Sequence, residues 1–145
     1  MNKYINELRK RIALKTAVRS LKIPPTVKQV SFTFDDVPES AFLNAQPVLE
    51  RYGYRGTFYV ALSFLDTDKT NINLYHKNHL SACLINGHEL GCHTYSHNRT
   101  YQNSKADFLT NDIHKNTVKL NETGIKYKFQ NFSYPFGEQT IKMRT

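Results

Sequence analysis

Several features that mark particular protein classes are scarce in this sequence. It has only two cysteines, Cys83 and Cys92, which is too few for a disulfide framework or a zinc knuckle. No run approaches the roughly 18 apolar residues of a membrane helix, and no apolar run of the signal-peptide type follows the basic N-terminus. Free thiols suit a reducing compartment. We therefore expect a cytoplasmic protein without a transmembrane segment.

Positive charge is in excess, while the rest of the composition is ordinary. The net charge is +8 with neutral histidines, and hydrophobic residues make up 39% of the chain of 145 residues, as expected for one folded domain. An excess of this kind favours anionic partners. However, no nucleic-acid recognition motif is present, and the basic residues are not interleaved with aromatic ones. We expect no nucleic-acid partner, and the composition does not indicate an oligomeric state.

Hydropathy patterning predicts a chain in which strands and helices alternate. Residues 1–25 are expected to form an amphipathic helix and a linker, and residues 26–145 a domain. The predicted strands are residues 30–34, 57–62, 88–93 and 129–134. The predicted helices between them are residues 40–51, 74–85 and 106–122. This order indicates an α/β fold with about four parallel strands and crossover helices.

Residues suited to chemistry follow three of the predicted strands. Asp35 and Asp36 follow the first strand, and His93 ends the third and leads to His97. The segment 134–136 ends the fourth. Because ligands gather at the carboxyl ends of parallel strands, we expect these groups to share one edge of the sheet.

His93 and His97 have a spacing that suits a metal site. Two imidazoles four residues apart bind one ion when a tight turn brings them together. With Asp36 they form a set of two histidines and one carboxylate, which leaves positions for water and substrate. We expect zinc, and cobalt, nickel, manganese or iron would also be compatible.

The adjacent carboxylates of Asp35 and Asp36 suit a division of roles. On an extended chain their side chains diverge, so that one can hold the metal while the other faces an activated water as general base. An alternative is that one of them caps the helix predicted to begin near residue 40.

Three segments resemble the first three motifs of the NodB-type polysaccharide deacetylases, carbohydrate esterase family 4, in order and spacing. They are residues 33–36, 87–97 and 132–137, and the resemblance covers roughly residues 28–137. It implies a distorted (β/α) barrel. It also implies a carbohydrate deacetylase that acts on carbon–nitrogen bonds other than peptide bonds, or on O-acetyl groups, of a polysaccharide or oligosaccharide.

The resemblance also implies roles for single residues. It makes Asp35 the catalytic base, assigns the oxyanion contact to the backbone N–H of Phe136, and places Pro135 and Phe136 in the wall of the substrate groove. The implied ligands of the divalent metal are Asp36, His93 and His97.

The sequence departs from the family pattern in two places. Ser133 stands where the third motif usually opens with an arginine that orients the base. The later motifs, including a histidine that acts as general acid, have no counterpart after Gly137. We therefore expect an incomplete barrel, truncated after the third motif. Two functions stay open: an active deacetylase, or a catalytically impaired metal-binding fragment or pseudoenzyme.

The other polar residues are expected to have ordinary roles. Cys92 should pack in the core. Residues expected at the surface or at helix ends are His76, His79, His88 and His114. Carboxylates expected to be solvated are Asp66, Asp68, Asp107 and Asp112.

Overall fold

The computed structural model describes residues 3–15, 24, 26, 28–67, 74–99 and 106–138. Its strands are β1 (Phe32–Phe34), β2 (Gly56–Val60) and β3 (Glu89–Cys92). Its α-helices are α1 (Lys3–Lys15), α2 (Gln46–Arg51), α3 (Lys77–Ile85) and α4 (Ala106–Glu122). A π-helical turn at Ala41–Ala45 leads into α2, and 3₁₀ turns lie at Leu62–Phe64 and Pro135–Gly137.

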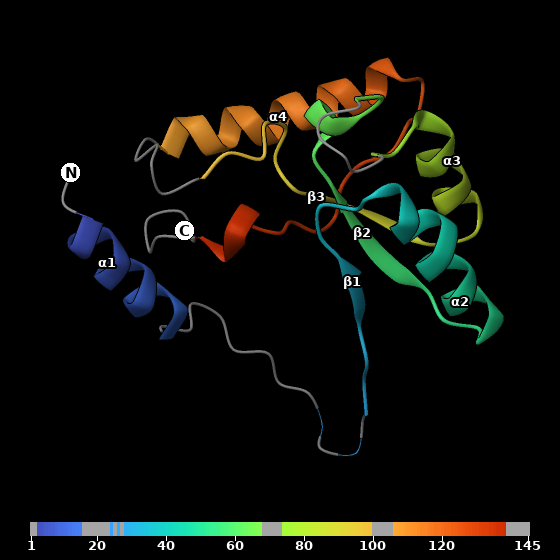
Figure 1. The fold of residues 1–145 in the computed structure, drawn as a ribbon, viewed down its shortest axis with the longest axis horizontal. Coiled ribbons are helices and arrows are strands. Elements are labelled where there is room, and N and C mark those ends of the chain that lie inside the picture. Colours follow the sequence, from blue (N-terminus) through green and yellow to red (C-terminus); the bar gives the residue numbers. More distant parts are fainter. Residues whose placement is uncertain are drawn as a thin grey trace.

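The strands form one parallel sheet, as the alternation of elements predicted, and their order in it is β1-β2-β3. Thr33 pairs with Thr57 between β1 and β2, and Phe58 pairs with Leu90 between β2 and β3. In Figure 1, α2 and α3 lie on one side of the strands and α4 crosses at their upper end. Because all three strands run the same way, their carboxyl ends meet at one rim.

The fourth predicted strand is much shorter than expected. It consists of a single parallel bridge between Cys92 and Phe132. The Cys92 N–H donates to the carbonyl of Asn131, and the Cys92 carbonyl accepts from the Ser133 N–H. Continuing this ladder would require the carbonyl of Ser133 and an N–H at Pro135. Proline has no N–H, and the Ser133 carbonyl instead bonds a histidine ring, so the ladder stops.

Aromatic side chains hold the strands against the helices. The Phe58 ring stacks between those of Phe34 and Phe42, with centroid separations of 4.7 and 5.1 Å. Gly91 in β3 is required by a close approach, because a Cβ there would lie 2.3 Å from the Tyr59 ring. Cys92 is buried, as expected.

The amphipathic helix predicted within residues 1–25 is present as α1 over residues 3–15, and residues 16–23 lie outside the described part. Ile5 and Leu8 on α1 are about half exposed. Among the described residues, no helix has the length and apolar character needed to span a bilayer.

Candidate metal centre and active site

The two carboxylates after β1 point to different partners. Asp36 has a φ of 60°, in the left-handed region that residues with side chains rarely adopt. Its Oδ1 lies against two imidazoles, whereas Asp35 Oδ2 accepts a hydrogen bond of 3.0 Å from the Ser133 hydroxyl. Val37, which follows, is fully buried. The turn therefore separates the two side chains.

His93 and His97 converge on Asp36. The Nδ1 of His93 lies 2.9 Å from the Ser133 carbonyl, which only accepts hydrogen bonds, so this nitrogen carries the proton. The Nε2 of His93 therefore presents a lone pair, 3.3 Å from Asp36 Oδ1. The Nε2 of His97 lies 2.6 Å from the same oxygen.

This arrangement fits a divalent cation. The three donor atoms of Asp36, His93 and His97 lie within 4.8 Å of one another. His97 Nε2 is buried, and its contact with Asp36 Oδ1 lacks the geometry of a regular hydrogen bond. A buried nitrogen without a hydrogen bond is costly unless a further group satisfies it. Burial lowers the pKa of His97, and the Asp36 charge offsets part of that shift, so the ring is neutral and able to bind at neutral pH.

The turn between the two histidines is held by side chains on both sides. Thr94 and His97 have φ angles of 60° and 52°, and the Thr94 hydroxyl accepts the His97 N–H. The Ser96 N–H and hydroxyl both donate to Asp112 Oδ2, at 3.1 and 2.8 Å. Strained backbone of this kind persists where its surroundings specify it, and such strain is common at functional sites.

The expectation of a solvated Asp112 was wrong. Asp112 is only 8% exposed and faces the turn that carries His97. Helical spacing was the available signal, because it shares one face of α4 with Leu109, Asn116 and Leu120, all buried. The structure bears out exposure of Asp66 and Asp107, while Asp68 lies outside the described residues.

Asn116 is a second residue of α4 that sequence reasoning missed. Its side chain is fully buried. Its Oδ1 accepts the Leu62 N–H at 2.8 Å, and its Nδ2 donates to the Val60 carbonyl at 2.9 Å. The amide thus satisfies the backbone where β2 ends and fixes α4 beside the rim.

The third motif places Phe136 beside the histidines. Pro135 is buried, and Phe136, with a φ of 60°, is about half exposed with its ring 4.8 Å from that of His97. Arg99 lies over the Phe136 ring and forms an ion pair with Glu138, which is only 2% exposed. Neither Arg99 nor Glu138 was singled out from the sequence.

The histidines that were expected at the surface do not behave alike. His114 is exposed, and His76 pairs with Asp66 at the surface. His88 is instead 5% exposed and makes hydrogen bonds within the fold, which corrects the expectation.

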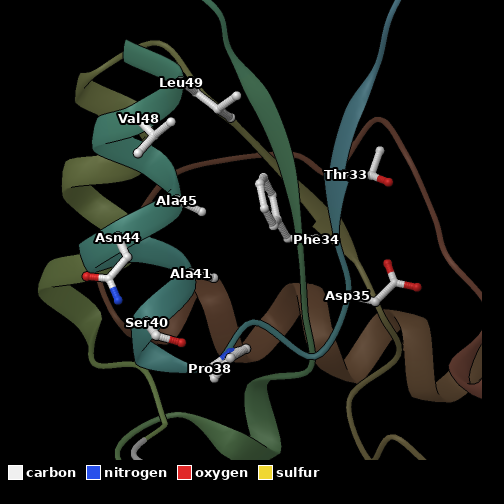
Figure 2. A pocket seen from close by; sticks show the side chains of 10 residues that line it. All are labelled: Thr33, Phe34, Asp35, Pro38, Ser40, Ala41, Asn44, Ala45, Val48 and Leu49. Carbon is white, nitrogen blue, oxygen red and sulfur yellow. The ribbon is translucent and has the colours of Figure 1, made fainter. Parts of the chain in front are cut away.

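A groove of about 790 Å³ lies between β1 and α2. Figure 2 shows the Phe34 ring pointing toward the helix, whereas Thr33 and Asp35 project away from it. Because strand side chains alternate, the side chains of Thr33 and Asp35 lie on the sheet face opposite that of Phe34. The groove-lining residues are Thr33, Phe34, Asp35, Pro38, Ser40, Ala41, Asn44, Ala45, Val48 and Leu49.

Comparisons with known proteins address the family and the fold. The family model described as Polysaccharide deacetylase matches residues 22–145. No curated protein matches the sequence.

Solved structures share the fold. IcaB from Ammonifex degensii matches with 23% identity and a TM-score of 0.73, over 86% of this chain and 56% of that one. The Xyl-CE4 domain of a multidomain xylanase from the hindgut metagenome of Trinervitermes trinervoides matches with 25% identity and a TM-score of 0.60, over 78% of this chain and 51% of that one. BA3943, described as a CE4 family pseudoenzyme from Bacillus anthracis, matches with 16% identity and a TM-score of 0.65, over 83% and 40%.

The chain thus spans about half the length of the solved structures it matches. Its parallel sheet with flanking helices corresponds to part of the NodB-type (β/α) barrel, as the resemblance implied. Since the family model covers most of the chain, this protein belongs to the polysaccharide deacetylase family.

Proposed function

We propose that this chain removes N- or O-linked acetyl groups from a polysaccharide or oligosaccharide by metal-dependent hydrolysis. The observation that carries this proposal is the convergence of three donor atoms within 4.8 Å, with a second carboxylate on the neighbouring residue. The family match supports the substrate class. An acetylated glycan is accordingly the proposed partner.

Asp36, His93 and His97 would hold the metal. Two imidazole nitrogens and one carboxylate oxygen suit zinc, and cobalt, nickel, manganese and iron accept the same donors. When bound, such an ion supplies Lewis acidity, which makes a water molecule easier to deprotonate and polarises a carbonyl. The Ser133 carbonyl orients His93 for this role by fixing the proton on Nδ1.

Asp35 is the proposed general base. Its side chain is exposed at the rim, so it can take a proton from a water that attacks the acetyl carbon. The proton then passes to the leaving amine or hydroxyl as acetate is released. We assign both transfers to Asp35, and we therefore expect slow turnover compared with enzymes that use a separate general acid.

The third motif would stabilise the tetrahedral intermediate that forms at the acetyl carbon. We assign the backbone N–H of Phe136 to the developing oxyanion, because Phe136 lies beside His97 and its backbone is held in the left-handed region. The Phe136 ring, which is exposed, and Pro135 would form part of the wall against which a sugar packs.

A metal-binding protein without turnover is the second candidate. It is favoured by Ser133, which stands in the place of the usual arginine. Both candidates predict metal binding, so only turnover separates them. The cytoplasmic location inferred from the sequence stays a prediction.

Elemental analysis of the purified chain tests the metal site. We expect about one zinc or similar ion per chain in the wild type, lost in His93→Ala and in Asp36→Ala. His114→Ala is the matched control, because His114 is exposed on α4 and outside the cluster. A folded wild type that takes up no metal from an excess of zinc would contradict the proposal.

Acetate release from acetylated glycans then separates the two candidates. The loaded wild type should release acetate and Asp35→Asn should not, although the variant keeps its metal. Metal binding without acetate release would identify the chain as the impaired form.

A further inference from the structure

Ser133 contacts two different groups of the site through two different parts of its structure. Its main-chain carbonyl accepts the Nδ1–H of His93 at 2.9 Å. Its hydroxyl donates to Asp35 Oδ2 at 3.0 Å, across 98 residues of sequence. One residue thus contacts both a proposed metal ligand and the proposed base.

The backbone of Ser133 is fixed independently of these two contacts. Its N–H donates to the Cys92 carbonyl at 3.0 Å, beside the bridge that joins Phe132 to Cys92. Since Cys92 is the last residue of β3, the sheet itself sets where the carbonyl and hydroxyl of Ser133 lie.

Asp35 depends on this anchor for its orientation. Its side chain is exposed, and in the part of the chain that the structure describes its hydrogen bond comes from Ser133. An exposed carboxylate on a short side chain otherwise exchanges between rotamers in water. The bond also occupies one oxygen only, so the other can accept a proton.

We propose that Ser133 is the positioning residue that sets the base Asp35 relative to the metal ligand His93. The inference rests on the proposed function for the roles of those two groups. The carbonyl of Ser133 selects the His93 tautomer that can bind a metal, and the hydroxyl holds Asp35 in the rotamer that faces the same centre. Base and ligand are therefore aligned through one anchored residue.

The division between main chain and side chain makes the proposal testable. Ser133→Ala removes the hydroxyl and keeps the carbonyl, and Ser133→Thr keeps both. In the zinc-loaded chain we expect Ser133→Ala to lower kcat about 10-fold, with KM and zinc affinity unchanged, because only the alignment of the base is lost. Ser133→Thr should restore kcat to within about 2-fold.

Thr123→Ala is the matched control for loss of a hydroxyl. Thr123 bonds the Leu120 carbonyl at the end of α4, and this substitution should leave kcat unchanged. Loss of zinc in Ser133→Ala, or unchanged kcat in an active chain, would overturn the proposal.

A structural measurement decides the question even if the chain releases no acetate. In crystals of the zinc-loaded proteins, Asp35 should hold one rotamer in the wild type and in Ser133→Thr, and leave it in Ser133→Ala. An unmoved Asp35 in Ser133→Ala would refute the positioning role. A wild type without turnover would instead refute the proposed deacetylation, while a displaced Asp35 would still support the role of Ser133.

Discussion

Two histidines at opposite ends of β3 have the same burial and different partners. His88 precedes the strand and is 5% exposed, and His93 follows it and is 1% exposed. The Nδ1 of His88 accepts the N–H of Gly56 at 3.0 Å. The Nδ1 of His93 donates to the carbonyl of Ser133 at 2.9 Å. One ring therefore meets a backbone donor and the other a backbone acceptor.

This difference decides what each ring can do. A neutral imidazole carries one proton, so the Nε2 of His88 holds it and donates to Glu50 at 3.1 Å. The Nε2 of His93 lacks it and offers a lone pair beside Asp36. His88 is thus satisfied within the fold, whereas His93 can bind a further group. The backbone partner of the ring, and not its burial, separates a structural histidine from a candidate ligand.

Metal affinity should show the largest contrast between the two ends of β3. We expect His93→Ala to lower zinc affinity by more than about 100-fold, since a ligand matters at least as much as the groups that orient ligands. His88→Ala should leave the affinity within about 3-fold, because its ring is not among the converging donors. Competition with a chromophoric chelator measures both. An equal loss in the two variants would remove the distinction.

Stability of the metal-free protein should depend on His88, which is satisfied within the fold. We expect His88→Ala to lower the free energy of unfolding by about 2–3 kcal/mol, because it leaves the Gly56 N–H without its acceptor and opens a cavity in a buried site. Urea unfolding of the metal-free forms measures the change, with His114→Ala as the exposed control. If His88→Ala proved no more destabilising than His114→Ala, the structural role of His88 would be wrong.

Asp112 offers a finer test at the rim. Asp112→Ala removes the acceptor of two hydrogen bonds from Ser96, which lies between the two proposed histidine ligands. We expect zinc affinity to fall about 10-fold, as is typical when a group that supports a ligand is lost. Asp107→Ala on the same helix removes an exposed carboxylate and should have no effect. Equal affinities in these two variants would show that the turn is held by other contacts.

The smallest expected effect is on the pH dependence of stability, which should differ between the two ends of β3. In the metal-free fold, burial lowers the pKa of His97 below its usual 6.5, so the unfolded chain binds that proton first and stability falls as pH drops below 6.5. The loss for one proton cannot exceed about 1.4 kcal/mol per pH unit. Thermal unfolding across pH 7 to 5 in the presence of a chelator measures it, and His97→Gln should flatten the slope.

At the other end of β3, Glu50 makes stability depend on pH in a lower pH range. Hydrogen bonds from Gln46 and Asn86 lower the pKa of Glu50 below 4.5, so its stabilising contribution is present above pH 4.5 and is lost as pH falls through the lowered value. Glu50→Gln should remove this second step and leave the first unchanged. Merging of the two steps in the wild type would contradict the assignment of separate pH windows to His97 and Glu50.

Much of the architecture follows from local pattern. The helix predicted for residues 106–122 has those bounds in the structure, and the three strands of the sheet lie inside or within one residue of their predicted segments. The meeting of Asp36, His93 and His97 at one rim also follows from the sequence, because parallel strands bring their carboxyl ends together. Apolar periodicity is a property that neighbouring residues determine, and the alternation of strands and helices along the chain implies parallel strands.

The tertiary structure decided which polar side chains make hydrogen bonds within the fold and with which partners. Asp107 and Asp112 lie on the same helix, yet it is Asp112 that accepts the Ser96 hydroxyl. The fourth strand shrank to one bridge, since its next hydrogen bonds would need an N–H at Pro135 and a carbonyl that His93 already occupies.

Burial periodicity was determined by the sequence itself, because it depends on residues a few positions apart. The tautomers of His88 and His93 and the orientation of Asp35 depend on partners 32, 40 and 98 residues away. Only the packed fold brings such partners within hydrogen-bonding distance, and a hydrogen bond requires both distance and direction to be right.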